Sequence, residues 1–331
     1  MARPRKLAAK RFALPANRPM LESVTRVLLI GARCRRQGIG EHVARWFAHA
    51  GATVCAVVGT SPETSAAAAA TLLERYGIDC RAYSSVEQAL ERETPDVVAV
   101  CSPYQYHREH LELSRAAGVH CLCEKPLWWE DHPQRVAATE RLAEGFARQG
   151  KLLATVTQWP FTLAAFFELH PAVREECLKS LSMELAPSRS GRNMVLDAAP
   201  HVLSLLEALV GDGDVIAPTA RWQGERHLTL EFRWGMGVDR PPVQVSLVLT
   251  TCERPPRPAG YTINGRKARR EIVLPQYDML FTDAGRQVPV EDPLKLLVRD
   301  FLGQIELGTQ TNAAPLACSI RALELLCAAA A

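Results

Sequence analysis

The segment that decides the fold runs from Val27 to Gly40 and has the sequence Val27-Leu-Leu-Ile-Gly31-Ala-Arg-Cys-Arg-Arg-Gln-Gly38-Ile-Gly40. Its apolar beginning predicts a buried strand, and the helical spacing of apolar residues starts directly after its last glycine. A glycine-rich turn at a helix N-terminus suits a pyrophosphate, because backbone N–H groups and the helix dipole face the anion. The spacing is longer than G-x-G-x-x-G by about four residues. The alternative interpretation is an ordinary strand-to-helix loop.

Arginines inside this turn favour the phosphate interpretation, since guanidinium groups bind phosphate oxygens in pairs. We therefore predict a dinucleotide site formed by the turn, with the residues Gly31, Arg33, Arg35, Arg36, Gly38, Ile39 and Gly40.

The end of the second predicted strand indicates which dinucleotide is bound. Sites that prefer NAD place an acid there, on the ribose 2′-hydroxyl. Here Thr60 and Ser61 follow the strand, and the first acid is Glu63, already in the next helix. Two hydroxyls near the loop arginines suit a 2′-phosphate, so we predict that NADP(H) is preferred over NAD(H).

Strands and helices alternate regularly from residue 24 to about residue 157. Near-continuous apolar strands between amphipathic helices indicate a parallel sheet covered on both faces. We expect strands at 27–30, 53–58, 80–83, 96–101, 120–123 and 152–157, and helices at 40–50, 61–76, 86–92, 106–117 and 133–148. Ser61-Pro62-Glu63 is expected to form the cap and first turn of the second helix.

The alternation of strands and helices stops after residue 180, where predicted strands follow one another with few helices between them. This pattern predicts a mainly antiparallel sheet. We expect strands at 181–185, 227–233, 243–249, 261–263 and 271–274, and helices at 198–210, 293–307 and 314–330.

These patterns predict an α/β domain followed by an α+β domain. The first, residues 24–152, is a doubly wound parallel sheet of the Rossmann type that binds a dinucleotide. The second, residues 153–331, has a mainly antiparallel, open-faced sheet for substrate binding and oligomerisation, and its last helix packs back on the first domain. Residues 1–23 are basic and interrupted by prolines, so we expect a flexible arm, with a transit peptide as the alternative.

Composition excludes several classes of protein. The chain has 331 residues, 47% of them hydrophobic and 23% charged, which is ordinary for a globular protein. A net charge of +3 is too small to indicate a nucleic-acid partner. No run of apolar residues is long enough to predict a membrane span. Ten cysteines without a CxxC pair or zinc-ligand spacing predict a reducing, cytoplasmic location and no metal site.

Four motifs resemble those of the Gfo/Idh/MocA oxidoreductases, a family named for glucose-fructose oxidoreductase and inositol dehydrogenase. Ser102-Pro103-Tyr104 with His107 resembles that family's T-P-N-x-x-H, and Glu124-Lys125-Pro126 resembles its E-K-P. The stretch from Gly191 to His201 resembles G-x-x-x-D-x-G-x-H, and Tyr261 to Gly265 resembles V-x-G-x-x-G. The resemblance covers about residues 24–330, and four motifs in the right order make it specific for the family but not for the substrate.

The chain also departs from the family pattern. Tyr104 replaces the usual asparagine, and Ala199 replaces the glycine before Pro200. The stretch Thr157-Gln158-Trp159-Pro160-Phe161 replaces N-R-R-F, and tryptophans at 128 and 129 follow the E-K-P motif. The lost arginine and the added tryptophans put the usual sugar-sized pocket in doubt.

The resemblance implies roles for individual residues. Lys125, Asp197 and His201 are the implied catalytic set: His201 as general acid/base, Asp197 as its orienting partner, and Lys125 polarising the reacting oxygen or nitrogen. Asp197 and His201 are four apart, which places both on one face of the helix that we expect to begin near them. A helix cap is the structural alternative for Asp197. Further cofactor-binding residues are implied at Ser102, Pro103, Tyr104, His107, Glu124, Lys125 and Gln158, although His107 also suits closure of its turn.

Trp128 and Trp159 are expected either to form an aromatic wall of the substrate pocket or to lie in the core. The function implied is an NADP(H)-dependent oxidoreductase that transfers a hydride between nicotinamide and a hydroxyl/carbonyl carbon of a small sugar or polyol. The alternatives are an imine reductase acting on an amine-containing metabolite and a non-catalytic NADP-binding sensor. The intact proton-relay set argues against the sensor.

Apolar residues in two strands of the second domain predict self-association. Leu228, Leu230 and Phe232 in one strand, and Leu247 and Leu249 in the other, are interpreted as lying on opposite faces of the sheet. An uncovered apolar sheet face is a large patch for a monomer. We therefore expect a homodimer or homotetramer that contacts a small-molecule substrate, with no nucleic-acid or membrane partner.

Overall fold

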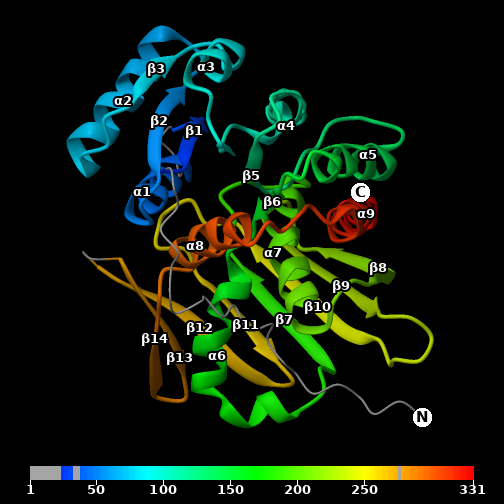
Figure 1. Ribbon diagram of the computed structural model, residues 1–331. Coiled ribbons are helices and arrows are strands. Elements are labelled where there is room, and N and C mark those ends of the chain that lie inside the picture. The colour runs from blue at the N-terminus through cyan, green and yellow to red at the C-terminus, as the bar shows by residue number, and fades with distance from the viewer. Residues whose placement is uncertain (1–23, 33–37, 275–276) are drawn as a thin grey trace. The chain divides into compact units, whose positions relative to one another are not determined.

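A computed structural model describes residues 24–32, 38–274 and 277–331 (Figure 1). The chain forms two compact units. The nucleotide-binding unit comprises residues 24–156 and 294–316, and the second unit comprises residues 157–293 and 317–331. The basic arm expected at residues 1–23 lies outside the described residues.

The first sheet has six parallel strands in the order β3-β2-β1-β4-β5-β6, which is the strand order of the Rossmann fold. The strands are β1 (Arg26–Ile30), β2 (Thr53–Val58), β3 (Arg81–Tyr83), β4 (Val97–Val100), β5 (His120–Glu124) and β6 (Leu153–Val156). Nearly every residue of β1, β2 and β4 is buried, because helices cover both faces of the sheet. The predicted doubly wound domain is confirmed.

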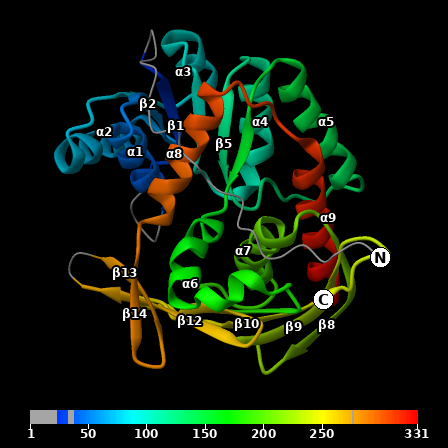
Figure 2. The same ribbon diagram turned by 60° about the horizontal axis from the view of Figure 1, so that its bottom comes forward.

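Five helices connect these strands, and they pack on the two faces of the sheet (Figure 2). They are α1 (Gly40–His49), α2 (Pro62–Tyr76), α3 (Val86–Glu93), α4 (His107–Ala116) and α5 (Arg135–Arg148). The predicted cap of α2 is present: Ser61 accepts a hydrogen bond from the Thr64 amide, and the Thr64 hydroxyl accepts one from the Ser61 amide. Gly77, in the left-handed region, ends this helix.

The second sheet has eight strands in the order β14-β13-β12-β11-β7-β10-β9-β8. Among the described strands of this sheet, β7 and β10 are the one pair that is parallel, so the expected mainly antiparallel sheet is confirmed. Its strands are β7 (Ser180–Leu185), β8 (Asp214–Trp222), β9 (His227–Gly235), β10 (Val243–Thr250), β11 (Ala259–Ile263), β12 (Arg266–Val273), β13 (Asp278–Asp283) and β14 (Arg286–Val290). The strands β8, β13 and β14 were not predicted, and β12 begins five residues before the predicted strand because its basic start hid the alternation.

Helices α6 (Leu163–Leu169) and α7 (Asn193–Val210) pack on one face of this sheet (Figure 2). Among the described residues, α7 is the helix that is long and apolar enough to cross a membrane, but most of it is buried within the fold. Burial against the sheet accounts for its apolar composition, as in the core helix of a globular unit. Short 3₁₀ helices lie at η1 (Tyr104–Tyr106), η2 (Trp159–Thr162) and η3 (Pro171–Glu175).

The last two helices divide between the units differently from the prediction. From Leu294 onward, α8 (Pro293–Glu306) belongs to the nucleotide-binding unit, where Phe301 packs edge-on against Phe47 of α1 at 6.3 Å. From Ala317 onward, α9 (Ala313–Ala329) belongs to the second unit, where the Cys318 thiol donates to the Gly213 carbonyl over 2.8 Å. Within the nucleotide-binding unit, α8 therefore packs against α1.

The argument for an apolar open sheet face is wrong. Leu228, Leu230 and Phe232 are buried together with Leu247 and Leu249, because they all point to the same face of the sheet. The register pairs Leu230 with Leu247 and Leu228 with Leu249, so the two strands alternate in phase. The opposite face carries the polar residues of these strands.

Candidate functional site

The glycines of the first loop allow a close approach between β1 and α1. Gly31 has a φ of 87°, and a Cβ there would lie 2.8 Å from the Cys101 carbonyl oxygen and the Ser102 nitrogen. A Cβ on Gly40 would lie 2.2 Å from the Gly31 carbonyl oxygen. Neither position accepts a side chain, since the opposing atoms are backbone. The helix therefore begins directly against the end of the strand, as in a pyrophosphate-binding turn.

The beginning of α1 offers backbone donors to an anion. Ile39 is the N-cap residue, and its side chain has no oxygen with which to cap the helix. The first N–H groups of a helix have no partner inside the helix, and they carry the positive end of its dipole. Gly38 and Ile39 are half-buried at this end, whereas Arg33, Arg35 and Arg36 lie outside the described residues. A pyrophosphate suits this end of the helix, because the first backbone N–H groups lack intrahelical acceptors and can donate to its oxygens.

The end of β2 differs from the predicted 2′-phosphate site. The hydroxyl of Ser61 is used as the cap of α2, while Thr60 is exposed. Hydrogen bonds from the Ser61 side chain and from its own backbone lower the pKa of Glu63, so this carboxyl group is ionised at neutral pH. A carboxylate beside Ser61 repels a phosphate and suits a ribose hydroxyl.

His107 joins two of the family motifs. Its side chain is fully buried, with Nδ1 2.9 Å from the Pro126 carbonyl oxygen and Nε2 2.7 Å from the Ser102 carbonyl oxygen. Burial lowers its pKa, and a neutral imidazole donates through one nitrogen at a time. His107 thus holds the turn after β4 to the turn after β5. Its complete burial favours this structural role over direct contact with a cofactor.

The remaining residues of the two turns lie at the carboxyl edge of the first sheet, where open α/β sheets bind ligands. Ser102 hydrogen-bonds His110 over 3.0 Å, and burial lowers the pKa of His110 to about 4, so this imidazole is neutral. Pro103 precedes η1, and Tyr104 begins it. Glu124 ends β5, and Lys125 follows it, half-buried. The edge of the sheet therefore carries the residues expected near a cofactor.

Asp197 and His201 lie inside α7 rather than at its start. The helix begins at Asn193, so the capping alternative for Asp197 is wrong. Pro200 is also inside the helix, where it has no N–H to donate to the carbonyl of Leu196. Asp197 and His201 are half-buried on one face of a helix whose residues 194–206 are otherwise almost all buried. They belong to the second unit together with Gln158, which precedes η2.

The two tryptophans predicted at the substrate pocket have different surroundings. Trp128 is 1% exposed, its indole N–H donates to the Thr139 hydroxyl, and the Arg108 guanidinium lies over its ring. Trp128 is thus a core residue of the nucleotide-binding unit, and its assignment to the substrate pocket is corrected. Trp159 packs edge-on against His201, with ring centroids 6.3 Å apart, which keeps it next to the candidate catalytic pair.

The sequence analysis missed Arg270, which lies beside Trp159, and Arg257, to which Arg270 is hydrogen-bonded. The guanidinium carbon of Arg270 lies 5.7 Å from the centre of the Trp159 ring, and the Arg270 Nη2 donates to the Arg257 carbonyl over 2.7 Å. Arg270 belongs to a basic run, residues 266–270, that directly precedes the strand expected at 271–274. The alternation of β12 was the available signal, since it places Arg270 on the same face as the buried Ala268.

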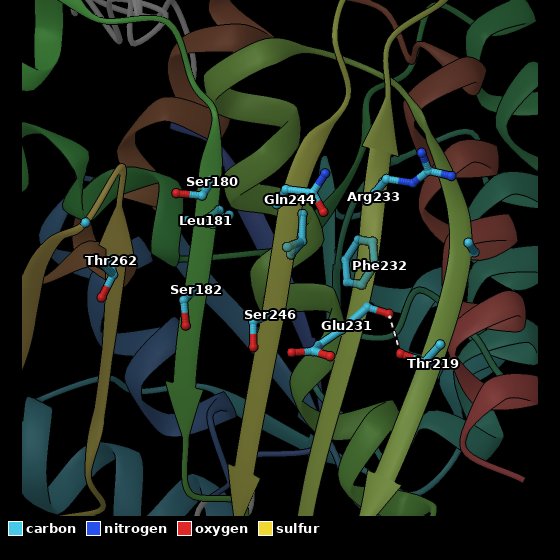
Figure 3. Close-up of a pocket in the computed structure, with 13 residues that line it drawn as sticks. Ser180, Leu181, Ser182, Thr219, Glu231, Phe232, Arg233, Gln244, Ser246 and Thr262 are labelled. Carbon is cyan, nitrogen blue, oxygen red and sulfur yellow. Dashed lines mark hydrogen bonds between the residues drawn. The ribbon is translucent and has the colours of Figure 1, made fainter.

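A pocket of about 550 Å³ lies on the polar face of the second sheet (Figure 3). Side chains from β7, β8, β9, β10 and β11 line it, including Ser182, Glu231, Arg233 and Ser246. It contains none of the predicted site residues. Within the described ranges, no three His, Cys, Asp or Glu side chains form a group that could hold a metal ion.

The strand order and the glycine turn define a dinucleotide-binding Rossmann domain. Residues 25–157 match the family described as "Oxidoreductase family, NAD-binding Rossmann fold". The matched residues include two of the four motifs that resemble the Gfo/Idh/MocA oxidoreductases, so this family match agrees with the resemblance.

Curated relatives match over short stretches. D-glucoside 3-dehydrogenase of Escherichia coli (strain K12) is 41% identical over 58 residues, which are 18% of this chain and 16% of the relative. UDP-N-acetylglucosamine 3-dehydrogenase of Acidithiobacillus ferrooxidans is 35% identical over 89 residues, 27% of this chain and 26% of the relative. The aligned stretches thus span about a quarter or less of these relatives.

Solved structures extend the similarity of fold to nearly the whole chain. UDP-N-acetylglucosamine 3-dehydrogenase from Acidithiobacillus ferrooxidans aligns with a TM-score of 0.68 and 20% identity, over 93% of this chain and 98% of its own. Levoglucosan dehydrogenase in complex with NADH and levoglucosan aligns with a TM-score of 0.67 and 15% identity, over 93% and 98%. The second unit therefore has the fold seen in these dehydrogenases.

Substitution of Gly40 tests the cradle. Gly40→Ala should lower the affinity for nicotinamide dinucleotides at least about tenfold and destabilise the protein by about 1–3 kcal/mol, because the new Cβ meets backbone. Gly145→Ala is the matched control, since its Cβ would meet the flexible Arg115 side chain within another helix. Fluorescence titration and thermal unfolding measure the two effects. Wild-type cofactor affinity in Gly40→Ala would contradict the assignment.

Proposed function

We propose that the chain is an NAD(P)-dependent oxidoreductase that interconverts a hydroxyl and a carbonyl group on a small sugar or polyol. The observation that carries this proposal is the Asp197–His201 pair on one face of α7, packed against the buried Trp159. A protein that only senses a dinucleotide needs no such pair. The names of the relatives, which are sugar dehydrogenases, support the substrate class.

The glycine cradle, the N-terminus of α1 and the turns after β4 and β5 would hold the dinucleotide. When bound, the nicotinamide supplies the hydride acceptor or donor. His201 takes the proton of the substrate hydroxyl during oxidation and returns it during reduction. Asp197, one helical turn earlier, orients the imidazole and stabilises its protonated form. Lys125 polarises the reacting oxygen with its positive charge.

The imine-reductase alternative rested on an aromatic-rich pocket. Trp128 packs in the core, and the Arg135 guanidinium lies 4.0 Å from the ring centre of Trp129. These surroundings leave Trp159 as the tryptophan beside the candidate catalytic pair, so the aromatic argument no longer favours imines. A substrate screen that includes imines, ketones, sugars and polyols compares the two chemistries directly.

Lys125→Met and His201→Asn should each reduce turnover by roughly 10²–10⁴-fold and leave cofactor affinity nearly unchanged, because they remove proton transfer and polarisation without altering the glycine cradle. Asp197→Asn should have a smaller effect, since an amide still hydrogen-bonds the imidazole. Lys179→Met, which removes an exposed lysine, is the matched control. Steady-state kinetics and cofactor titration separate the two quantities.

Two outcomes would contradict this assignment. Wild-type turnover in a protein that carries all three site substitutions would show that Lys125, Asp197 and His201 do not form a proton relay. Tight cofactor binding without turnover of any substrate class would favour the sensor.

We also propose that NADP(H) is the preferred cofactor, on the ground that three arginines lie in the first loop and no acid lies between Val58 and Glu63. Two observations oppose it. The Ser61 hydroxyl caps α2 beside the ionised Glu63, and levoglucosan dehydrogenase is seen with NADH. Charge-assisted bonds to a 2′-phosphate are worth about 1.5–3 kcal/mol, so NADPH should bind at least about tenfold more tightly than NADH.

Fluorescence titration with both cofactors measures the preference. Arg35→Gln should weaken NADPH binding more than NADH binding, whereas Glu63→Gln should strengthen NADPH binding and weaken NADH binding. Equal affinities, or tighter binding of NADH, would refute the preference.

Self-association and a cytoplasmic location stay predictions. The first now rests on the family resemblance, because the open sheet face is polar. A dimer or tetramer should give two or four times the 36.5 kDa chain mass in light scattering at micromolar concentration. Arg233→Glu, in the groove on that face, should reduce the mass if this surface forms the contact. A single 36.5 kDa species in the wild type would contradict self-association.

A further inference from the structure

Arg270 lies on the covered face of the second sheet. Its cross-strand neighbours are Ala259 on β11 and Phe281 on β13, both of which are buried. On the same face, Tyr261 stacks on Phe166 with ring centroids 5.0 Å apart and packs edge-on against Trp159 at 5.9 Å. The guanidinium of Arg270 therefore sits at an aromatic cluster, over the Trp159 ring.

A second arginine lies beside it. Arg257 is in the segment that leads into β11, and its carbonyl accepts the hydrogen bond from Arg270 Nη2. Each positive charge raises the free energy of the other charged guanidinium, and burial raises this free energy further. Both effects lower the pKa of Arg270 from its ordinary value, burial being the larger. An arginine remains charged at any physiological pH, so its buried guanidinium needs hydrogen-bond acceptors or an anionic partner.

No group of the described residues balances these charges. Nε and Nη2 of Arg257 and Nε of Arg270 are buried, and in the described part of the chain they have no hydrogen-bond partner. Neither guanidinium forms an ion pair with a described carboxylate. Buried N–H donors without partners are rare, and an unpaired buried charge is costly. Such donors in a native protein indicate a ligand that supplies the acceptors.

We propose that Arg257 and Arg270 bind an oxyanion, a carboxylate or a phosphate, carried by the substrate. This inference rests on the proposed function and specifies its substrate class as an anionic sugar or polyol. Planar guanidinium groups match both oxyanions through paired hydrogen bonds.

Trp159 connects this site to the catalytic pair, because its ring contacts both Arg270 and His201. The anionic group lies on one side of the indole and the reacting carbon lies near His201. The two arginines thus fix which hydroxyl of the substrate reaches the imidazole.

Isothermal titration calorimetry with the full chain tests the proposal, using glucose 1-phosphate, glucuronate and glucose as probes, with and without saturating NADPH or NADH. At least one anionic probe should bind at least about tenfold more tightly than glucose, as expected for charge-assisted hydrogen bonds. A gain for glucose 1-phosphate alone assigns a phosphate, and a gain for glucuronate alone assigns a carboxylate.

Arg270→Gln and Arg257→Gln should each remove this preference. Their matched controls are Arg269→Gln and Arg254→Gln, which change exposed arginines one and three residues away in the chain and should retain it. Without ligand, Arg270→Gln should not lower the unfolding midpoint, since it removes an unbalanced charge. The two variants are independent, so misfolding of either leaves the other to decide.

Equal affinity for glucose and both anions would overturn the inference, as would an equal loss in the control variants. Anion preference without hydride transfer would keep the arginine site and contradict the proposed function. Turnover of neutral sugars without anion preference would keep the proposed function and overturn the arginine site.

Discussion

The close contact between Gly40 and the Gly31 carbonyl is the constraint on which the nucleotide-binding unit depends. A Cβ at Gly40 would lie 2.2 Å from that oxygen, so α1 can begin directly at the end of β1 only without a side chain there. The contact directs the N-terminus of α1 toward the carboxyl edge of the sheet, where β4 and β5 also end. Cys101 and Ser102 close the same turn, since they lie against Gly31.

Buried polar groups have two different functions in this protein. In the nucleotide-binding unit they are satisfied internally: His107 contacts the carbonyls of Ser102 and Pro126 and holds the two motif turns together. In the second unit, Arg257 and Arg270 have buried donors without partners among the described residues. A satisfied group stabilises a turn, whereas an unsatisfied charged group is a cost that a bound anion offsets.

The nucleotide-binding fold could be predicted closely from the sequence. Strand β2 was predicted at its observed bounds, and the cap of α2 at Ser61 was predicted correctly, because burial and capping are encoded within a few residues. The start of α7 could not be predicted in this way. A helix was expected at 198–210, but it begins at Asn193, because packing on the sheet stabilises it despite the interior Pro200. The phase of β9 against β10 was also misjudged, since cross-strand register is not a local property.

The sequence by itself determined that a glycine turn joins β1 to α1, that a parallel sheet precedes an antiparallel one, and that Asp197 and His201 share a helix face. Each of these follows from residues close together in the chain. Only the tertiary structure decided that Trp128 lies in the core, that Trp159 packs against His201, and that Arg270 lies over Trp159 and bonds to Arg257. The physical reason is that burial and charge compensation depend on neighbours from distant strands and helices, and local periodicity does not specify which neighbours those are.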